Sequence, residues 1–206
     1  MLRIWGRISS INVRKVVLAA QLLEAPFERI DAGAAFGIVA TPDYRALNPN
    51  SLVPLIEDDG FALWESNVIV RYLCAKHAGG ALYPPQLRER FDAERWMDWQ
   101  QTTLNPAGRD AFVQLIRVPP DKRDPALVAQ SISRTQPLLD LLEAHLARRP
   151  FMAGDRLTMA DLPIACEVHR WRGLPIEHRP SPRLDRWYEG LRRQPAARGV
   201  LDLALA

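Results

Sequence analysis

Cysteine is scarce in this chain and long apolar runs are missing. The 206 residues include two cysteines, Cys74 and Cys166, and both fall in apolar stretches with helical spacing. This disfavours a disulfide framework, and we expect two buried free thiols in a reducing compartment. No run of about 18 apolar residues occurs, so we expect no membrane-spanning helix. Arg3, Arg7 and Arg14 interrupt the N-terminal apolar positions, which predicts the absence of a signal peptide and a cytoplasmic location.

Metal-ligand patterns and charge runs of one sign are also missing. The spacing of Cys, His, Asp and Glu fits no metal site, so we expect no bound metal. The formal net charge is +3, from 27 basic and 24 acidic residues. Basic and acidic residues alternate in segments such as 88–95, which is typical of solvated helix faces. We therefore expect no nucleic-acid partner, while a mild positive field favours small anionic ligands.

The first part of the chain alternates strand and helix signals. The predicted elements are a strand over residues 2–5, a helix over 13–23, a strand over 27–30, a short helix over 41–47, a hairpin of 54–57 and 61–64, and a helix over 66–76. Thr41 is the expected N-cap of the short helix, with Pro42 at its first position. The inner face of the last helix is predicted from its spacing to carry Val68, Ile69, Tyr72 and Leu73. This order predicts a mixed sheet covered by helices.

Glycine and proline pairs punctuate the chain after these elements. Gly79-Gly80 and Pro84-Pro85 predict a domain boundary, so we assign residues 1–79 to one domain and 88–206 to another. Helical periodicity alone continues beyond the boundary. It predicts helices over 88–104, 125–146, 158–171 and 182–193, with a kink or break at Pro137. The second domain is therefore predicted to be a helical bundle.

Ser10-Ile11-Asn12 lies at the junction of the first strand and the first helix. The N-terminus of a helix favours an anion, because its first N–H groups have no partner within the helix. A serine at this position can donate its hydroxyl proton to a thiolate. A plain N-cap is the alternative, in which Ser10 or Asn12 accepts backbone N–H bonds. The local sequence leaves both open.

Three further motifs follow at characteristic spacing. They are residues 48–58 (NPNSLVPLIED), 63–73 (LWESNVIVRYL) and 151–162 (FMAGDRLTMADL). Together with the Ser-x-Asn start, they resemble the cytosolic glutathione S-transferases over nearly the whole chain. The start is similar to that of serine-type bacterial, phi and Nu-like classes. The resemblance implies a thioredoxin-like βαβαββα domain that binds glutathione, an all-α domain that contributes the electrophile pocket, and a homodimer. Glutathione is then a co-substrate, and no cofactor is permanently bound.

The resemblance also implies roles for the N-terminal motif residues. Ser10 would stabilise the glutathione thiolate, which is the reactive form of the thiol. The spacing to Lys15 favours Ser10 over Ser9, which stays as the alternative. Asn12 would donate a second hydrogen bond to the sulfur or order the turn.

Glutathione itself is expected to lie along the next two motifs. In the resembled fold the Val53-Pro54 bond is cis, and the Val53 backbone pairs with the cysteinyl unit of glutathione like an added strand. Glu65 would accept the ammonium of the γ-glutamyl end, and the Ser66 N–H and hydroxyl would bind its carboxylate. The alternatives are a proline that opens an edge strand and ordinary helix capping.

Two positions depart from the family pattern. Leu52 stands where the family usually has Gln, Lys or Arg, and the loop over residues 33–40 has no polar side chain. Binding of the glycyl carboxylate is therefore left to Asn50, Arg45 or backbone N–H groups.

The first helix of the second domain carries the expected electrophile pocket. The resemblance places Trp96, Trp99, Asn105, Arg109 and Phe112 on this helix or directly after it. Aromatic faces suit flat hydrophobic compounds, and Arg109 suits an anionic group. Packing of the tryptophans in the core is the alternative.

Thr158 and Asp161 match a capping box in the third motif. We assign this pair to folding, not catalysis.

Three other activities remain open for a protein of this kind. They are glutathione-dependent disulfide reduction, an isomerase reaction that Ser9-Ser10 loosely suggests, and non-catalytic binding with the same fold. The incomplete carboxylate clamp motivates the last of these.

Overall fold

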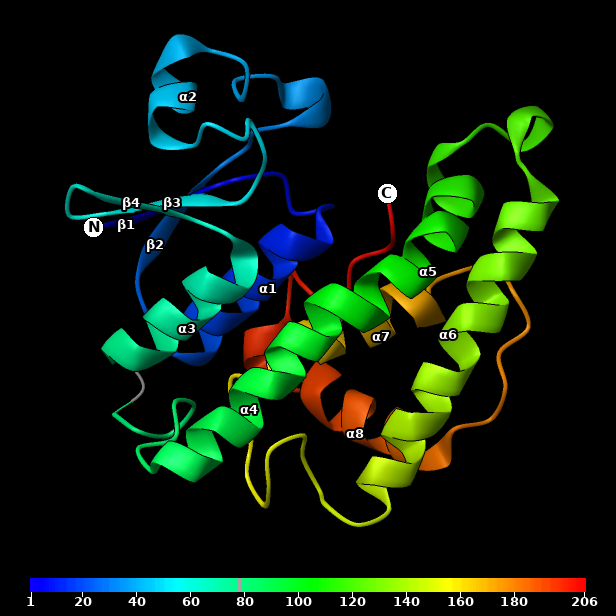
Figure 1. The fold of residues 1–206 in the computed structure, drawn as a ribbon. Coiled ribbons are helices and arrows are strands. Elements are labelled where there is room, and N and C mark those ends of the chain that lie inside the picture. The colour runs from blue at the N-terminus through cyan, green and yellow to red at the C-terminus, as the bar shows by residue number, and fades with distance from the viewer. Residues whose placement is uncertain (78) are drawn as a thin grey trace. The chain divides into compact units, whose positions relative to one another are not determined.

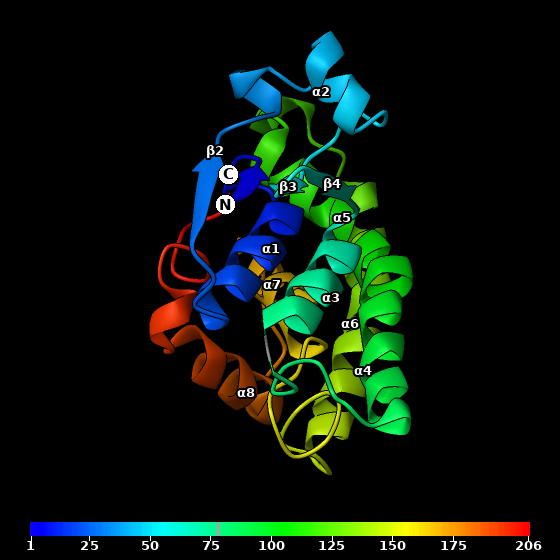
Figure 2. The same cartoon turned by 90° about the vertical axis from the view of Figure 1, so that its left-hand side faces the viewer.

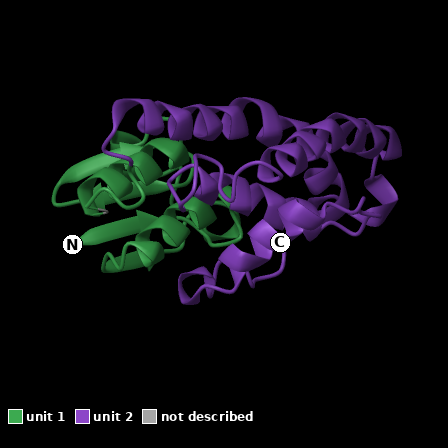
Figure 3. Ribbon diagram, turned by 90° about the horizontal axis from the view of Figure 1, so that it is seen from below, with its two compact units in different colours: residues 1–83 green, residues 84–206 purple. Residues whose placement is uncertain are grey.

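The chain divides into two compact units. The structure is a computed structural model that describes residues 1–77 and 79–206. The units are Met1–Tyr83 and Pro84–Ala206 (Figure 3). No helix within the described ranges combines the length and apolar character needed to cross a membrane.

The N-terminal unit is a four-stranded mixed sheet with helices on both sides. Its elements are β1 (Leu2–Trp5), α1 (Ile11–Leu22), β2 (Phe27–Ile30), α2 (Pro42–Leu47), β3 (Leu55–Asp58), β4 (Phe61–Trp64) and α3 (Ser66–His77), with a 3-10 turn over Ala34–Phe36. The strand order is β2-β1-β3-β4, with β1 parallel to β2 and antiparallel to β3. Helices α1 and α3 pack side by side on one face, and α2 lies on the other side of the sheet (Figure 1, Figure 2). This confirms the predicted βαβαββα thioredoxin-like fold.

Local sequence explains most of these elements. In β1, Leu2 and Ile4 point into the core and are at most 5% exposed, and Ile4 pairs with Ile56 of β3. Asp59 and Gly60 both have positive φ, 51° and 87°, as a two-residue hairpin turn requires. The Thr41 side chain caps α2 by accepting from the Tyr44 N–H, as predicted.

The buried face of α3 differs from the prediction. Ile69, Leu73 and Cys74 are fully buried, whereas Val68 is 42% exposed. Tyr72 is only half-buried, and its hydroxyl donates to Asp58 Oδ2 at 2.7 Å. The helix is therefore rotated relative to the predicted orientation, and Val68 and Tyr72 are not core residues. Cys74 and Cys166 are both buried and outside any disulfide, as predicted, and burial raises the pKa of Cys74 to about 12.

The elements of the C-terminal unit are all helices, as predicted, apart from an isolated antiparallel bridge between Phe151 and Gly154. Its elements are α4 (Leu87–Trp99), a π-helical turn over Gln100–Leu104, α5 (Asn105–Phe112), a second π-helical turn over Val113–Arg117, α6 (Pro125–Leu146), α7 (Asp161–Arg172) and α8 (Pro182–Arg192), with short 3-10 turns over Pro120–Lys122 and Pro195–Ala197. Helix α7 carries ten buried residues and packs against α4, α5 and α8. It forms the centre of this unit.

Two predictions about helix continuity were wrong. The helix predicted over 88–104 is interrupted by the π-helical turn, after which α5 follows directly. Pro106 lies in the first turn of α5 and has no N–H to donate, which accounts for the altered ladder before it. Helix α6 continues through Pro137, so the alternative of a break there was wrong.

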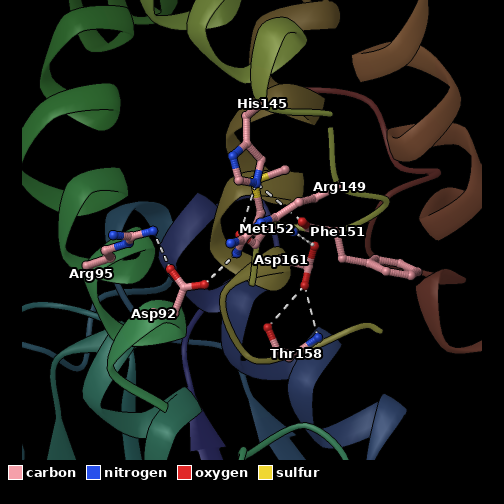
Figure 4. A network of polar contacts seen from close by, with 8 residues as sticks. All are labelled: Asp92, Arg95, His145, Arg149, Phe151, Met152, Thr158 and Asp161. Atoms are coloured by element: carbon pink, nitrogen blue, oxygen red, sulfur yellow. Dashed lines mark hydrogen bonds and ion pairs between the residues drawn. The ribbon is translucent and has the colours of Figure 1, made fainter. Parts of the chain in front are cut away.

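Asp161 organises the start of α7 (Figure 4). Its carboxylate accepts from the Thr158 N–H at 2.9 Å, which is the predicted capping bond, and from the Met152 N–H and Trp187 indole at 3.0 Å each. Burial nevertheless raises the pKa of Asp161 to about 6, against these hydrogen bonds. The residue joins α7, α8 and the preceding loop, which fits its assignment to folding.

Candidate functional site

Ser10 lies directly at the N-terminus of α1. The helix begins at Ile11, two residues before the predicted start, and the Ser10 carbonyl accepts its first bond, from the Arg14 N–H at 2.9 Å. Ser10 is 8% exposed. Ser10 is the N-cap residue of α1, but within the described residues its hydroxyl makes no capping bond, which argues against the alternative in which the Ser10 side chain caps the helix. Ser9 is half-buried beside it. The hydroxyl is thus held where an anion is favoured.

Helices α1 and α3 begin at the same edge of the sheet. Strand β4 is antiparallel to β3, which is antiparallel to β1, so β1 and β4 run in the same direction. Helix α1 follows β1 and α3 follows β4. Two helix N-termini therefore lie at one edge, and the first N–H groups of any helix have no acceptor within the helix itself.

Gly6 allows the backbone to approach closely at this edge. Its φ is 151°, and a Cβ there would lie 2.4 Å from Val13 Cγ2 and 3.2 Å from Val53 Cβ. Gly33 likewise faces the Val53 side chain, since its Cβ would lie 3.4 Å from Val53 Cγ1. Sequence analysis gave these glycines no role, although a glycine directly after a strand often indicates close backbone approach.

The Val53-Pro54 peptide bond is cis, as the resemblance predicted. Pro54 is buried and precedes β3, which lies inside the sheet between β1 and β4. The alternative of a proline that opens an edge strand was therefore wrong.

The loop before Val53 is held by its own side chains. Leu52 is 66% exposed, but its carbonyl accepts from the Tyr44 hydroxyl at 2.7 Å and the Asn48 amide at 2.9 Å. Burial raises the pKa of Tyr44 to about 12, although its hydrogen bond with Asn48 acts to lower it. Sequence analysis missed the anchoring role of Tyr44 and Asn48, because their shared acceptor is a backbone atom.

Both side chains considered for the glycyl carboxylate already have partners in this loop. The Asn50 amide donates to Asn48 Oδ1 at 3.2 Å, and Arg45 Nε donates to Ser51 Oγ at 3.2 Å. Each would have to exchange a hydrogen bond to bind a ligand.

Glu65 and Ser66 open α3 with an unusual backbone. Glu65 is exposed and has a φ of 73°, while its carbonyl accepts from the Ile69 N–H. Ser66 is 4% exposed. Its hydroxyl donates to Asn12 Oδ1 at 3.3 Å and accepts from Lys15 Nζ at 3.5 Å. The structure thus brings Asn12, Lys15 and Ser66 together.

The residues predicted to line the electrophile pocket lie in two separate places within the C-terminal unit, and the first holds Trp96 and Trp99. Trp96 and Trp99 meet edge to face with ring centroids 5.3 Å apart, beside a hollow of about 270 Å³ that Arg95 and Leu141 also line. Trp96 is 9% exposed. Its ring also packs against that of His145, with ring centroids 4.6 Å apart. The pair therefore joins α4 to α6.

Asn105 and Arg109 lie further along, on α5. The side-chain Oδ1 and the backbone carbonyl of Asn105 each accept a hydrogen bond from the Arg170 guanidinium, at 3.1 Å. Arg109 is exposed, and Phe112 is buried under Arg170, whose guanidinium lies 5.5 Å from the ring centroid. No three His, Cys, Asp or Glu side chains of the described residues are grouped to hold a metal ion.

The fold and the site define a class of protein. A thioredoxin-like unit with a cis proline before an inner strand, and a buried serine at the first helix N-terminus, is followed by an all-helical unit. This is the architecture of two-unit thioredoxin-fold proteins.

Comparisons with known proteins identify the family. The pattern of "Glutathione S-transferase, N-terminal domain" matches residues 9–76, and that of "Glutathione S-transferase, C-terminal domain" matches residues 125–190. Glutathione S-transferase GstB of Escherichia coli (strain K12) is 41% identical over 208 residues, which cover 100% of both chains. The chain therefore belongs to the glutathione S-transferase family.

Solved structures agree with this identification. The theta class glutathione S-transferase of Xanthomonas axonopodis pv. citri, with glutathione bound, is 41% identical with a TM-score of 0.96, over 100% of this chain and 99% of that chain. A glutathione S-transferase of Pseudomonas fluorescens is 27% identical with a TM-score of 0.83, over 95% of this chain and 96% of that chain.

Proposed function

We propose that this glutathione S-transferase activates glutathione through Ser10. The observation that carries the proposal is the buried Ser10 hydroxyl at the N-terminus of α1, which makes no capping bond to the part of the chain that the structure describes. The hydroxyl donates to the glutathione sulfur, so the thiol releases its proton to solvent and remains a thiolate. The thiolate then attacks an electrophilic carbon. A sulfur–carbon bond forms, and the leaving group departs with its electron pair.

The tripeptide is bound by backbone groups as much as by side chains. We assign the cysteinyl unit to the Val53 backbone, next to the cis bond to Pro54, with Leu52 flanking it. Glu65 binds the γ-glutamyl ammonium, and Ser66 binds the adjacent carboxylate. Asn50 is the candidate for the glycyl carboxylate.

We assign the electrophile to Trp96, Trp99, Asn105 and Arg109. Aromatic rings favour flat hydrophobic substrates, and Arg109 is the exposed cation of this set. An activity panel of aryl halides, epoxides, isothiocyanates, hydroperoxides and mixed disulfides tests this assignment. Turnover confined to disulfides would favour the reductase activity instead.

We also propose a homodimer in the cytoplasm. Leu52, Phe61 and Trp64 expose apolar surface on the N-terminal unit, which is typical of a subunit contact. Sedimentation equilibrium measures the oligomeric state directly, and a monomer at all concentrations would refute it.

Replacing Ser10 tests the proposed activation. Ser10→Ala should lower turnover at least about tenfold, because one hydrogen bond to a charged sulfur is lost. The pH profile should shift as well, since the bound thiol then keeps its proton to higher pH. Ser9→Ala is the matched control and should retain activity.

Two results would refute the proposal in different ways. An unchanged pH profile in Ser10→Ala would exclude Ser10 as the activating group. No calorimetric binding of glutathione at millimolar concentration by the wild type would favour a non-catalytic protein.

A further inference from the structure

Lys15 is a fully buried lysine next to the proposed glutathione site. Lys15 lies in the second turn of α1 and is 0% exposed. Its Nζ lies 3.5 Å from Ser66 Oγ at the start of α3. An ammonium group only donates hydrogen bonds, so this contact fixes Ser66 Oγ as the acceptor.

The hydroxyl proton of Ser66 is directed by this contact. Because Ser66 Oγ accepts from Lys15, its own proton is free to donate to Asn12 Oδ1, 3.3 Å away. The Asn12 carbonyl is thereby turned toward Ser66. Its NH₂ group then lies on the other branch of the amide. Asn12 is in the first turn of α1, two residues after Ser10.

We propose that Lys15 is a positioning residue that sets the direction of this hydrogen-bond chain. It acts through Ser66 to present the Asn12 NH₂ group, not its carbonyl, to the glutathione sulfur. The inference rests on the proposed function. It also means that Ser66 offers the γ-glutamyl carboxylate its backbone N–H, since its hydroxyl proton is used by Asn12.

Without the Lys15 ammonium, the direction of the hydrogen bond between Ser66 and Asn12 is no longer fixed. Ser66 Oγ is then able to accept from the Asn12 NH₂ group, and the amide rotates. Its carbonyl faces the sulfur and disfavours the thiolate. Both contacts are long for hydrogen bonds, and such contacts often tighten when ligand binds.

The test measures how much bound glutathione is thiolate, by ultraviolet absorbance across a pH series. In Lys15→Met the thiolate fraction below the pKa should fall about tenfold, with glutathione still bound. Lys15→Arg, which keeps the donor, should restore most of it. Lys76→Met is the matched control, because Lys76 pairs with Asp58 away from Ser66, and its thiolate fraction should match the wild type.

A double-mutant comparison separates positioning from general charge effects. If Lys15 acts through Asn12, Lys15→Met should add nothing in an Asn12→Ala background. Ser66→Ala removes the hydroxyl that links Lys15 to Asn12, and it should lower the thiolate fraction as much as Lys15→Met does. This variant keeps the test decisive where Lys15→Met does not fold.

Specific outcomes overturn the inference. A wild-type thiolate titration in Lys15→Met or in Ser66→Ala would refute it while leaving the Ser10 proposal intact. An additive effect of Lys15→Met in Asn12→Ala would show that its charge acts directly on the sulfur. Failure of the wild-type enzyme to bind glutathione would instead refute the proposed function.

Discussion

At the scale of single residues, Gly6 shows how closely the site is packed. The space that a side chain would occupy at position 6 is filled by Val13 from α1, and Val53 lies just beyond. Its φ of 151° is also one that residues with a Cβ rarely adopt. The end of β1, the start of α1 and the cis-proline loop therefore pack closely together, which is possible because residue 6 has no side chain.

Gly6→Ala should destabilise the protein by about 2 kcal/mol or more, because the new Cβ forces Val13 and the backbone apart. Urea unfolding measures the change. Gly190→Ala in α8 is the matched control. Its Cβ would meet no atom within 4 Å, so it should stabilise the helix by about 0.5–1 kcal/mol. Equal unfolding curves for Gly6→Ala and wild type would show that this contact relaxes freely.

Some site residues were predictable from local sequence and others were not. The place of Ser10 at the start of the first helix and the cis bond at Pro54 depend on motifs a few residues long, so sequence analysis predicted both. The contact of Lys15 with Ser66 joins residues 51 positions apart. It depends on how α1 packs against α3, and periodicity within either helix does not determine that.

At the scale of elements, Arg170 of α7 holds the segment where α4 gives way to α5. Its guanidinium donates to both oxygens of Asn105 and pairs with Glu167 at 2.6 Å. Glu167 in turn accepts from Gln100, in the π-helical turn, at 2.8 Å. The interruption of the helix was not predicted, because helical periodicity continues through it and the groups that stabilise it come from a helix about 65 residues away.

Arg170→Met should destabilise the protein by about 3–5 kcal/mol, because Glu167 then stays buried without its cationic partner. Urea unfolding measures this. The double variant Arg170→Met/Glu167→Gln should recover much of the loss, since the buried charge is removed as well. Arg192→Met is the control, because the Arg192–Glu189 pair on α8 is exposed on both sides, and little change is expected. A double variant as unstable as Arg170→Met would contradict this explanation.

At the scale of the whole molecule, each unit contains a buried acid, and the two respond to pH in opposite ways. Burial acts to raise the pKa of Asp58, but hydrogen bonds from Lys76 and Tyr72 outweigh it, and the net pKa is lowered. Asp58 therefore stabilises the N-terminal unit above about pH 4, and this contribution is lost as pH falls through its folded pKa. Asp161 has a pKa raised to about 6.

The raised pKa of Asp161 predicts that the helical unit gains stability as pH falls. The folded unit holds this proton more tightly than the unfolded chain, so the gain grows from about pH 6 and is complete below about pH 4. Hydrogen exchange should show α7 better protected at about pH 5 than at pH 7, whereas α3 and the β3–β4 hairpin lose protection only below about pH 4. Asp161→Asn should remove the gain in protection of α7 at about pH 5. Asp58→Asn should remove the loss of protection in α3 and the hairpin below about pH 4. A change in α7 that persists in Asp161→Asn would mean that another group carries the linkage.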